Sequence, residues 1–238
     1  MQRMTEWTRL ARSAKAAVLA TVLAAAPPAL GHAAAIKGTV QYVGPPPDAK
    51  KISVTVDQFV CGKDKDAEDL VLSAQRGIRN AVVSLASPPA GARWEFSTAP
   101  VFLDQRQCVF TPRVIVVPAG GTVEFLNSDR LLHNIHSTAK DNPVFNRTQP
   151  RGRTIPITFP KPEVVRIGCD LHGWMRAWIV VMEHPFHAVT GGDGEFTLPN
   201  VPPGKYTLNV WHETLGVVTR DVTVGDGDAS VTIEMRRR

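Results

Sequence analysis

The stretch Cys169-Asp170-Leu171-His172-Gly173-Trp174-Met175 places a thiol, an imidazole and a thioether within seven residues. Runs typical of β-strands flank it, Val164–Ile167 before and Ala177–Val181 after, so the stretch is expected to form a loop between two strands. Sulfur ligands beside imidazole favour copper, whereas a thioether is not a usual ligand of zinc. His133 upstream can supply the second imidazole of a His2Cys set, with Met175 as a weak axial ligand.

The spacing C-x2-H-x2-M followed by a β-branched strand resembles the ligand loop of the amicyanins, which belong to the cupredoxins. Upstream, Gly121-Thr122-Val123-Glu124-Phe125-Leu126-Asn127 leading to His133-Asn134 is similar to the segment that carries the first histidine ligand in amicyanin and plastocyanin. The resemblance spans residues 99–182 and implies a Greek-key β-barrel holding one type 1 copper ion. It implies that His133, Cys169 and His172 are the equatorial ligands and that Met175 is the axial ligand.

Two features of the loop depart from the family. Leu171 and Gly173 stand where the family usually has prolines, and Asp170 replaces a hydroxyl residue after the cysteine. The negative charge of Asp170 is expected to favour the oxidised ion and lower the reduction potential. By resemblance, Asn134 ties its own loop to the Cys169 loop through hydrogen bonds and so supports the ligands from behind.

The same residues have other possible roles. Taken alone, a cysteine is usually a small buried apolar residue, and a lone methionine usually fills a core. A binuclear copper centre needs a second loop cysteine where Val165 stands, and a c-type haem needs C-x-x-C-H, which the sequence lacks. His136 follows His133 by three residues, and positions i and i+3 of a strand point to opposite faces, so His136 is not expected to be a ligand.

The resemblance implies a non-enzymatic carrier of single electrons, because a bound Met175 leaves no open coordination position. An exposed edge of the His172 ring, within an apolar collar of Leu171, Gly173 and Trp174, is expected to meet the partner. The partners implied are a periplasmic dehydrogenase and a c-type cytochrome. The alternative is a module that stores, delivers or senses copper without carrying electrons.

Residues 1–33 predict a cleaved export signal, because a basic start precedes the apolar run Ala16–Ala26 and small residues surround Gly31-His32-Ala33. We therefore expect a periplasmic protein with no stable membrane insertion after cleavage. An oxidising compartment favours a disulfide between Cys61 and Cys108, the alternative being two separate buried thiols.

Charge does not indicate nucleic-acid binding. Of the formal net charge of +5, the first 33 residues contribute +3, from four basic residues and one acidic residue. The rest of the chain has no basic stripe with interleaved aromatic residues, which is the pattern that nucleic-acid binding requires.

The remaining segments predict further β-structure, and the fold class is therefore all-β. Residues 34–98 have no chemical motif. Residues 183–238 resemble the second half of a carboxypeptidase-regulatory-like, or transthyretin-like, β-sandwich. We expect the barrel to be inserted into this sandwich, in which case residues 82–85 pair with or pack against residues 196–198 or 206–210. Residues 113–126 and 188–198 each predict a β-hairpin. A second metal site at His184, His187 and His212 is weighed against surface or hydrogen-bonded histidines, which are favoured.

Overall fold

The computed structural model of this chain describes residues 34–45, 47–48, 50–97 and 99–237. These residues belong to one compact unit, which is all-β as predicted. The predicted export signal, residues 1–33, lies outside the described residues. Among the residues described, no helix has the length and apolar character needed to span a bilayer.

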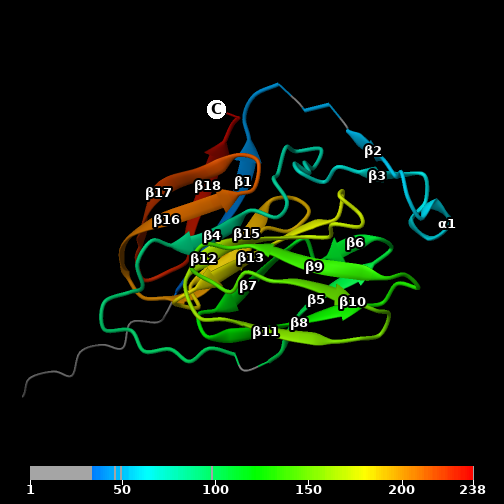
Figure 1. Cartoon of the computed structure of the whole chain (residues 1–238). Coiled ribbons are helices and arrows are strands. Elements are labelled where there is room, and N and C mark those ends of the chain that lie inside the picture. Colours follow the sequence, from blue (N-terminus) through cyan, green and yellow to red (C-terminus); the bar gives the residue numbers. More distant parts are fainter. Residues whose placement is uncertain (1–33, 46, 49, 98, 238) are drawn as a thin grey trace, which may run out of the picture. The chain divides into compact units, whose positions relative to one another are not determined.

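The first and last parts of the chain form two sheets that share one apolar core (Figure 1). One sheet has the order β15-β1-β18, with bounds Glu195–Val201, Ala34–Tyr42 and Ala229–Met235. The other has the order β14-β4-β16-β17, with bounds His187–Val189, Val82–Leu85, Gly204–His212 and Gly216–Val224. β4 pairs with β16 from Leu85–Leu208 to Val82–Trp211, so the pairing expected of a split sandwich is present.

The middle of the chain forms two further sheets, drawn in green and yellow in Figure 1. The five-stranded sheet has the order β10-β9-β12-β13-β7, with bounds Asn146–Gln149, His133–Thr138, Glu163–Gly168, Arg176–Met182 and Val114–Pro118. The four-stranded sheet has the order β11-β8-β5-β6, with bounds Ile155–Phe159, Gly121–Asn127, Val101–Arg106 and Val109–Thr111. Alternating apolar residues of both sheets, such as Phe125 and Ile167, build their common core.

Both predicted hairpins are wrong in the same way. β7 and β8 lie in different sheets, since β7 pairs with β13 and β8 with β5 and β11. Likewise β14 pairs with β4, whereas β15 pairs with β1. In each case the tight turn carries the chain from one sheet to the other.

A third piece of the chain, residues 51–66, belongs to neither pair of sheets; we call it the strap. It contains β2 (Lys51–Ser53), α1 (Gln58–Cys61) and β3 (Asp64–Asp66), and β2 pairs with β3. The strap lies within residues 34–98, the predicted N-terminal β segment, whose strands β1 and β4 belong to the terminal sheets. The predicted disulfide between Cys61 and Cys108 is present and joins the strap to the connection between β5 and β6.

The middle sheets contact the terminal sheets through polar and aromatic pairs. Arg113 donates two hydrogen bonds to the carboxylate of Glu213, at 2.5 and 3.0 Å, and both side chains are 10% exposed or less. The rings of Trp178 in β13 and Trp211 in β16 meet edge to face at 5.4 Å. A buried ion pair of this geometry fixes one relative arrangement of the two parts, because separating them would leave both charges unpaired.

Candidate metal centre

The predicted ligand loop joins two adjacent antiparallel strands. β12 ends at Gly168 and β13 begins at Arg176, and these two residues are paired. Between them, the backbone N–H of Met175 donates to the carbonyl of His172 at 2.8 Å, which closes a turn. His133 is the first residue of β9, the strand next to β12. The sheet therefore brings His133 beside Cys169 although 36 residues separate them in sequence.

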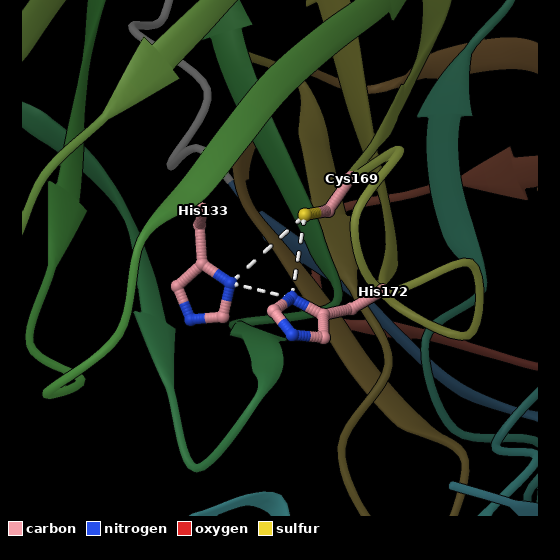
Figure 2. Close-up of side chains that lie close together, drawn as sticks. All are labelled: His133, Cys169 and His172. Carbon is pink, nitrogen blue, oxygen red and sulfur yellow. Dashed lines mark hydrogen bonds between the residues drawn. The ribbon is translucent and has the colours of Figure 1, made fainter. Parts of the chain in front are cut away.

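Figure 2 shows that the side chains of His133, Cys169 and His172 converge. The two Nδ1 atoms are 2.9 Å apart, and the Cys169 sulfur lies 3.9 Å from His133 Nδ1 and 3.7 Å from His172 Nδ1. All three residues are buried. Two atoms that bind one ion at about 2.0–2.3 Å and at trigonal angles lie about 3.5–3.8 Å apart. The sulfur–nitrogen spacings fit such a shared ion, and the closer pair of nitrogens corresponds to a narrower angle.

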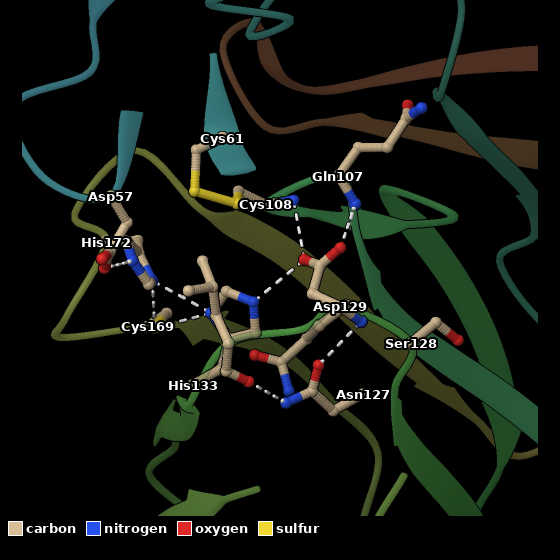
Figure 3. Close-up of polar contacts among 12 residues, drawn as sticks. Asp57, Cys61, Gln107, Cys108, Asn127, Ser128, Asp129, His133, Cys169 and His172 are labelled. Atoms are coloured by element: carbon tan, nitrogen blue, oxygen red, sulfur yellow. Dashed lines mark hydrogen bonds and ion pairs between the residues drawn. A yellow bond between two sulfur atoms is a disulfide. The ribbon is translucent and has the colours of Figure 1, made fainter. Parts of the chain in front are cut away.

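In both rings, the contact made by Nε2 determines whether Nδ1 carries a proton. His133 Nε2 lies 2.9 Å from Asp129 Oδ2, and His172 Nε2 lies 2.9 Å from Asp57 Oδ2 (Figure 3). A carboxylate oxygen accepts, so each Nε2 carries a proton, and in a neutral ring Nδ1 is then a bare lone pair. Two lone pairs facing each other at 2.9 Å repel unless a proton or a metal ion lies between them. The tautomers therefore prepare the site for a positive ion.

The protonation of the ligands depends on their burial. Burial lowers the pKa of His133 and outweighs the raising effect of its hydrogen bond to Asp129, so its imidazole is kept neutral. Burial also raises the pKa of the Cys169 thiol, an effect partly offset by the backbone N–H groups of Asn134, His172 and Leu171. A metal ion deprotonates a coordinating thiol outright, so the buried Cys169 is suited to bind as a thiolate.

Met175, the predicted axial ligand, is 1% exposed and packs in the core of the middle sheets. Together with Cys169 and Arg166 it lines a cavity of about 360 Å³. Coordination by Met175 stays a prediction.

Asn134 and Asp170 link the two ligand-bearing segments. The backbone N–H of Asp170 donates to Asn134 Oδ1 at 2.7 Å, and Asn134 Nδ2 donates to Asp170 Oδ2 at 3.1 Å. Asp170 also accepts from Asn146 Nδ2 at 2.6 Å and lies 2.9 Å from Nδ1 of the partly exposed His136. The hydrogen bond from His136 is the largest cause that lowers the pKa of Asp170. His136 thus points away from His133, as the strand geometry predicts.

Asp129 and Asp57 contact the two candidate histidine ligands, and neither was predicted from the sequence. Asp129 Oδ2 accepts from the backbone N–H of Cys108 at 2.8 Å as well as from His133, and its Oδ1 accepts from the backbone N–H of Gln107 at 2.6 Å. Cys108 also accepts a hydrogen bond from Trp174 Nε1 at 2.9 Å. Cys108 therefore contacts Asp129, which binds His133, and through its disulfide it also holds the strap that carries Asp57, which binds His172. In the sequence, the only indication that Asp129 contacts His133 is its position four residues before that histidine.

The expectation of an exposed His172 ring edge is wrong. His172 is 0% exposed, because Asp57 of the strap covers Nε2 and the ring of Trp174 lies 5.1 Å from it. Of the three residues expected to form an apolar collar on the surface, Leu171 and Gly173 are exposed, whereas Trp174 is half-buried. A partner that approaches this loop therefore meets Leu171 and the strap before it meets the imidazole.

Another grouping of ligand-type residues was found in the described part of the chain. It consists of Cys108, Asp129 and His133, but the sulfur of Cys108 is committed to the disulfide. His184, His187 and His212 belong to neither group found among the described residues. His184 and His212 are buried within or beside the terminal sheets, and burial lowers the pKa of both.

Comparisons with known proteins return copper proteins and one domain family of polysaccharide lyases. A copper-containing nitrite reductase from Thermus scotoductus SA-01 is 28% identical over 42% of this chain and 26% of its own, with a TM-score of 0.34. A purple cupredoxin from Nitrosopumilus maritimus is 22% identical over 34% of this chain and 99% of its own, with a TM-score of 0.31. A reduced amicyanin variant is 20% identical over 42% of this chain and 98% of its own, with a TM-score of 0.33.

The family model for domain II of polysaccharide lyase family 4 matches residues 150–232, less than half of the chain. This family is not the carboxypeptidase-regulatory-like one expected from the sequence, so the kinship of the terminal sheets stays a prediction. No curated protein matches the chain. At these TM-scores the similar structures carry no functional inference, which rests on the side chains of the site.

Proposed function

We propose that this protein is an exported type 1 copper protein that carries one electron at a time. The observation that supports this most is the placement of the two imidazoles: each Nε2 lies 2.9 Å from a carboxylate oxygen, and the two Nδ1 atoms face each other and the Cys169 sulfur. Two nitrogens and one soft sulfur, with a thioether nearby, are the donor set of blue copper sites. His133, Cys169 and His172 would hold the ion, with Met175 as the weak fourth ligand.

The chain's own residues supply what such a carrier needs. When bound, the copper ion would supply a one-electron redox couple. The hydrogen bonds of Asn134, Asp129 and Asp57 hold the ligands from three different segments, which limits their movement between oxidation states. Burial of all three ligands excludes water from the ion. A rigid dry site needs little rearrangement when an electron arrives or leaves.

Export to an oxidising compartment is part of the proposal. The disulfide between Cys61 and Cys108 supports it, because structural disulfides persist in the periplasm and are rare in the cytosol. The proposed partners are a periplasmic dehydrogenase and a c-type cytochrome, and we assign no catalysis to the chain itself. Exposed apolar side chains adjoin the site in sequence: Leu132 beside His133, Leu171 beside His172 and Val56 beside Asp57. Weak redox complexes use small patches of this kind.

A copper storage, delivery or sensing role is the second candidate. The full burial of His172 beneath the strap favours it, since a covered ligand lengthens the path of an electron to a partner. The rate of electron self-exchange distinguishes the two roles. A carrier exchanges electrons rapidly between its copper(I) and copper(II) forms, whereas a storage protein has no need to do so.

The visible spectrum of the purified copper(II)-loaded protein tests the copper site. A thiolate ligand is expected to give an intense charge-transfer band, which Cys169→Ser abolishes. His136→Ala is the matched control, because His136 is an imidazole beside the site that points away from the ligands, and its band is expected to remain. A wild-type protein that binds no copper, or that binds it without this band, contradicts the proposal.

A further inference from the structure

The strap is a mostly exposed segment with few attachments to the rest of the chain. Of its residues, 51–66, Val54 and Cys61 are buried, at 1% and 2% exposed, and the rest are exposed or half-buried. The disulfide fixes Cys61 to Cys108, and Lys65 Nζ donates to the carbonyl of Gln107 at 2.7 Å. Phe59 at the far side of α1 is fully exposed. So much exposed chain gains little from burial, and its position is set by these few attachments.

Asp57 has an unusual conformation at the start of α1. Its φ of 53° and ψ of 31° lie in the left-handed region, which costs about 1–2 kcal/mol for an L-residue and is best tolerated by asparagine, aspartate and glycine. It is the N-cap residue, yet its side chain makes no capping hydrogen bond. A capping aspartate ordinarily accepts from the N–H groups of the first helical turn. Here the carboxylate is directed elsewhere.

Asp57 instead contacts His172, 115 residues later, with Oδ2 at 2.9 Å from Nε2. Figure 3 shows that this contact mirrors the one between Asp129 and His133 on the other side of the site. The two carboxylates differ in their surroundings, because Asp129 is 7% exposed and Asp57 is 49% exposed. Asp129 lies in the connection between β8 and β9 of the middle sheets, whereas Asp57 lies on the strap.

We propose that Asp57 is a positioning residue for the copper ligand His172, delivered to it by the disulfide-anchored strap. This inference rests on the copper site proposed above. The carboxylate holds the ring as the Nε2–H tautomer and turns the Nδ1 lone pair towards the sulfur of Cys169. Its negative charge also stabilises copper(II) more than copper(I), since the charge on the ion is larger in the oxidised state. Removing such a support from a metal-bound histidine typically weakens metal binding about 10–100-fold.

Two substitutions remove the carboxylate while keeping the backbone conformation. Asp57→Asn keeps the shape and tolerates a positive φ but loses the charge, and Asp57→Gly loses the side chain where a positive φ carries no penalty. Asp64→Asn is the matched control, because Asp64 is an exposed carboxylate of the same strap whose ion-pair partner is Lys51. A purely structural role for Asp57 would loosen the strap without changing the ring or the ion.

The first measurement uses the full-length, metal-free protein. Long-range nitrogen–proton NMR reports the tautomer of His172 and the exchange rate of its Nε2 proton. We expect the Nε2–H tautomer with slow proton exchange in the wild type and in Asp64→Asn. In Asp57→Gly we expect the second tautomer to appear and exchange to be at least tenfold faster. Identical tautomers and exchange rates in all three proteins overturn the inference, and this holds whether or not copper binds.

The second measurement uses the copper-loaded proteins. We expect Asp57→Asn and Asp57→Gly to weaken copper(II) binding at least tenfold relative to copper(I), while Asp64→Asn changes neither. A tenfold change in that ratio raises the reduction potential by about 59 mV. A potential that stays at the wild-type value in both Asp57 variants overturns the inference while the blue band preserves the proposed function. A wild type that binds no copper overturns the proposed function, and the NMR comparison then decides the role of Asp57 alone.

Discussion

Replacement of Asp129 by asparagine tests how the site is supported, because this carboxylate makes three hydrogen bonds. Its Oδ2 accepts from His133 Nε2 and from the backbone N–H of Cys108, and its Oδ1 accepts from the backbone N–H of Gln107, at 2.9, 2.8 and 2.6 Å. An asparagine has one oxygen and one NH2 group. If the NH2 group takes the place of Oδ1, the partly buried N–H of Gln107 loses its acceptor; if it takes the place of Oδ2, the buried N–H groups of Cys108 and His133 lose theirs.

The expected cost follows from that single mismatch. A hydrogen bond to a charged acceptor contributes about 1.5–3 kcal/mol, and a buried donor left without a partner costs about 1–3 kcal/mol. Asp129→Asn is therefore expected to lower the free energy of unfolding of the metal-free protein by about 3 kcal/mol. For a unit of this size that corresponds to a fall of about 6–12 °C in the melting temperature. The copper affinity is expected to fall about 10–100-fold in addition.

Thermal unfolding of the metal-free protein, followed by copper titration, measures both effects. Asp104→Asn is the matched control, because Asp104 is a half-buried carboxylate of strand β5 that accepts two exposed hydrogen bonds from Ser128, the residue next to Asp129. The control is expected to lose less than about 1 kcal/mol. If Asp129→Asn melts within a degree or two of Asp104→Asn, Asp129 does not support His133 in the way that these contacts indicate.

Three further predictions concern other parts of the molecule. Replacing Cys61 and Cys108 together by alanine is expected to cost about 4 kcal/mol for a closed loop of this length and to increase hydrogen exchange throughout the strap; unchanged exchange there would show that the strap is held by other contacts. His212 is buried and its pKa is lowered to about 4, so the folded state binds its proton less readily than the unfolded state, whose pKa is 6.5. Its contribution to stability is therefore complete above pH 6.5 and lost as the pH falls to about 4, which amounts to about 3 kcal/mol; unfolding curves at pH 7.5 and 4.5 should differ less in His212→Gln, and an equal difference would contradict this. Met175→Gln is expected to lower the reduction potential while copper stays bound, and voltammetry that finds no decrease would remove Met175 from the ligand set.

The sequence predicted the ligand-bearing part of the site because that information is local. Cys169, His172 and Met175 lie on one loop, and alternation in the neighbouring strands places His133 on the inner face and His136 on the outer one. The disulfide was predictable from cysteine number and compartment. These inferences need no knowledge of how distant segments pack.

The covered face of His172 could not be predicted, because it depends on a contact across 115 residues. The strap has no apolar periodicity that would indicate where it packs, and the run around Asp64 and Asp66 is charged like any solvated loop. The two mistaken hairpins have a related cause. A Gly-rich turn has the same local chemistry whether the chain returns to its own sheet or crosses to another.

The pairing of β4 with β14 has a consequence for the order in which the chain folds. Ser84 pairs with His187, and the N–H of Leu85 donates to the carbonyl of Phe186. The entire middle region is therefore the connection of a β-hairpin. Closing it as an unfolded loop of about 100 residues costs about 3 kcal/mol more than closing a four-residue turn. Prior folding of the middle sheets brings the two ends together, so we expect the terminal sheets to assemble on a finished middle region, and a substitution that delays the middle region to delay the terminal sheets as well.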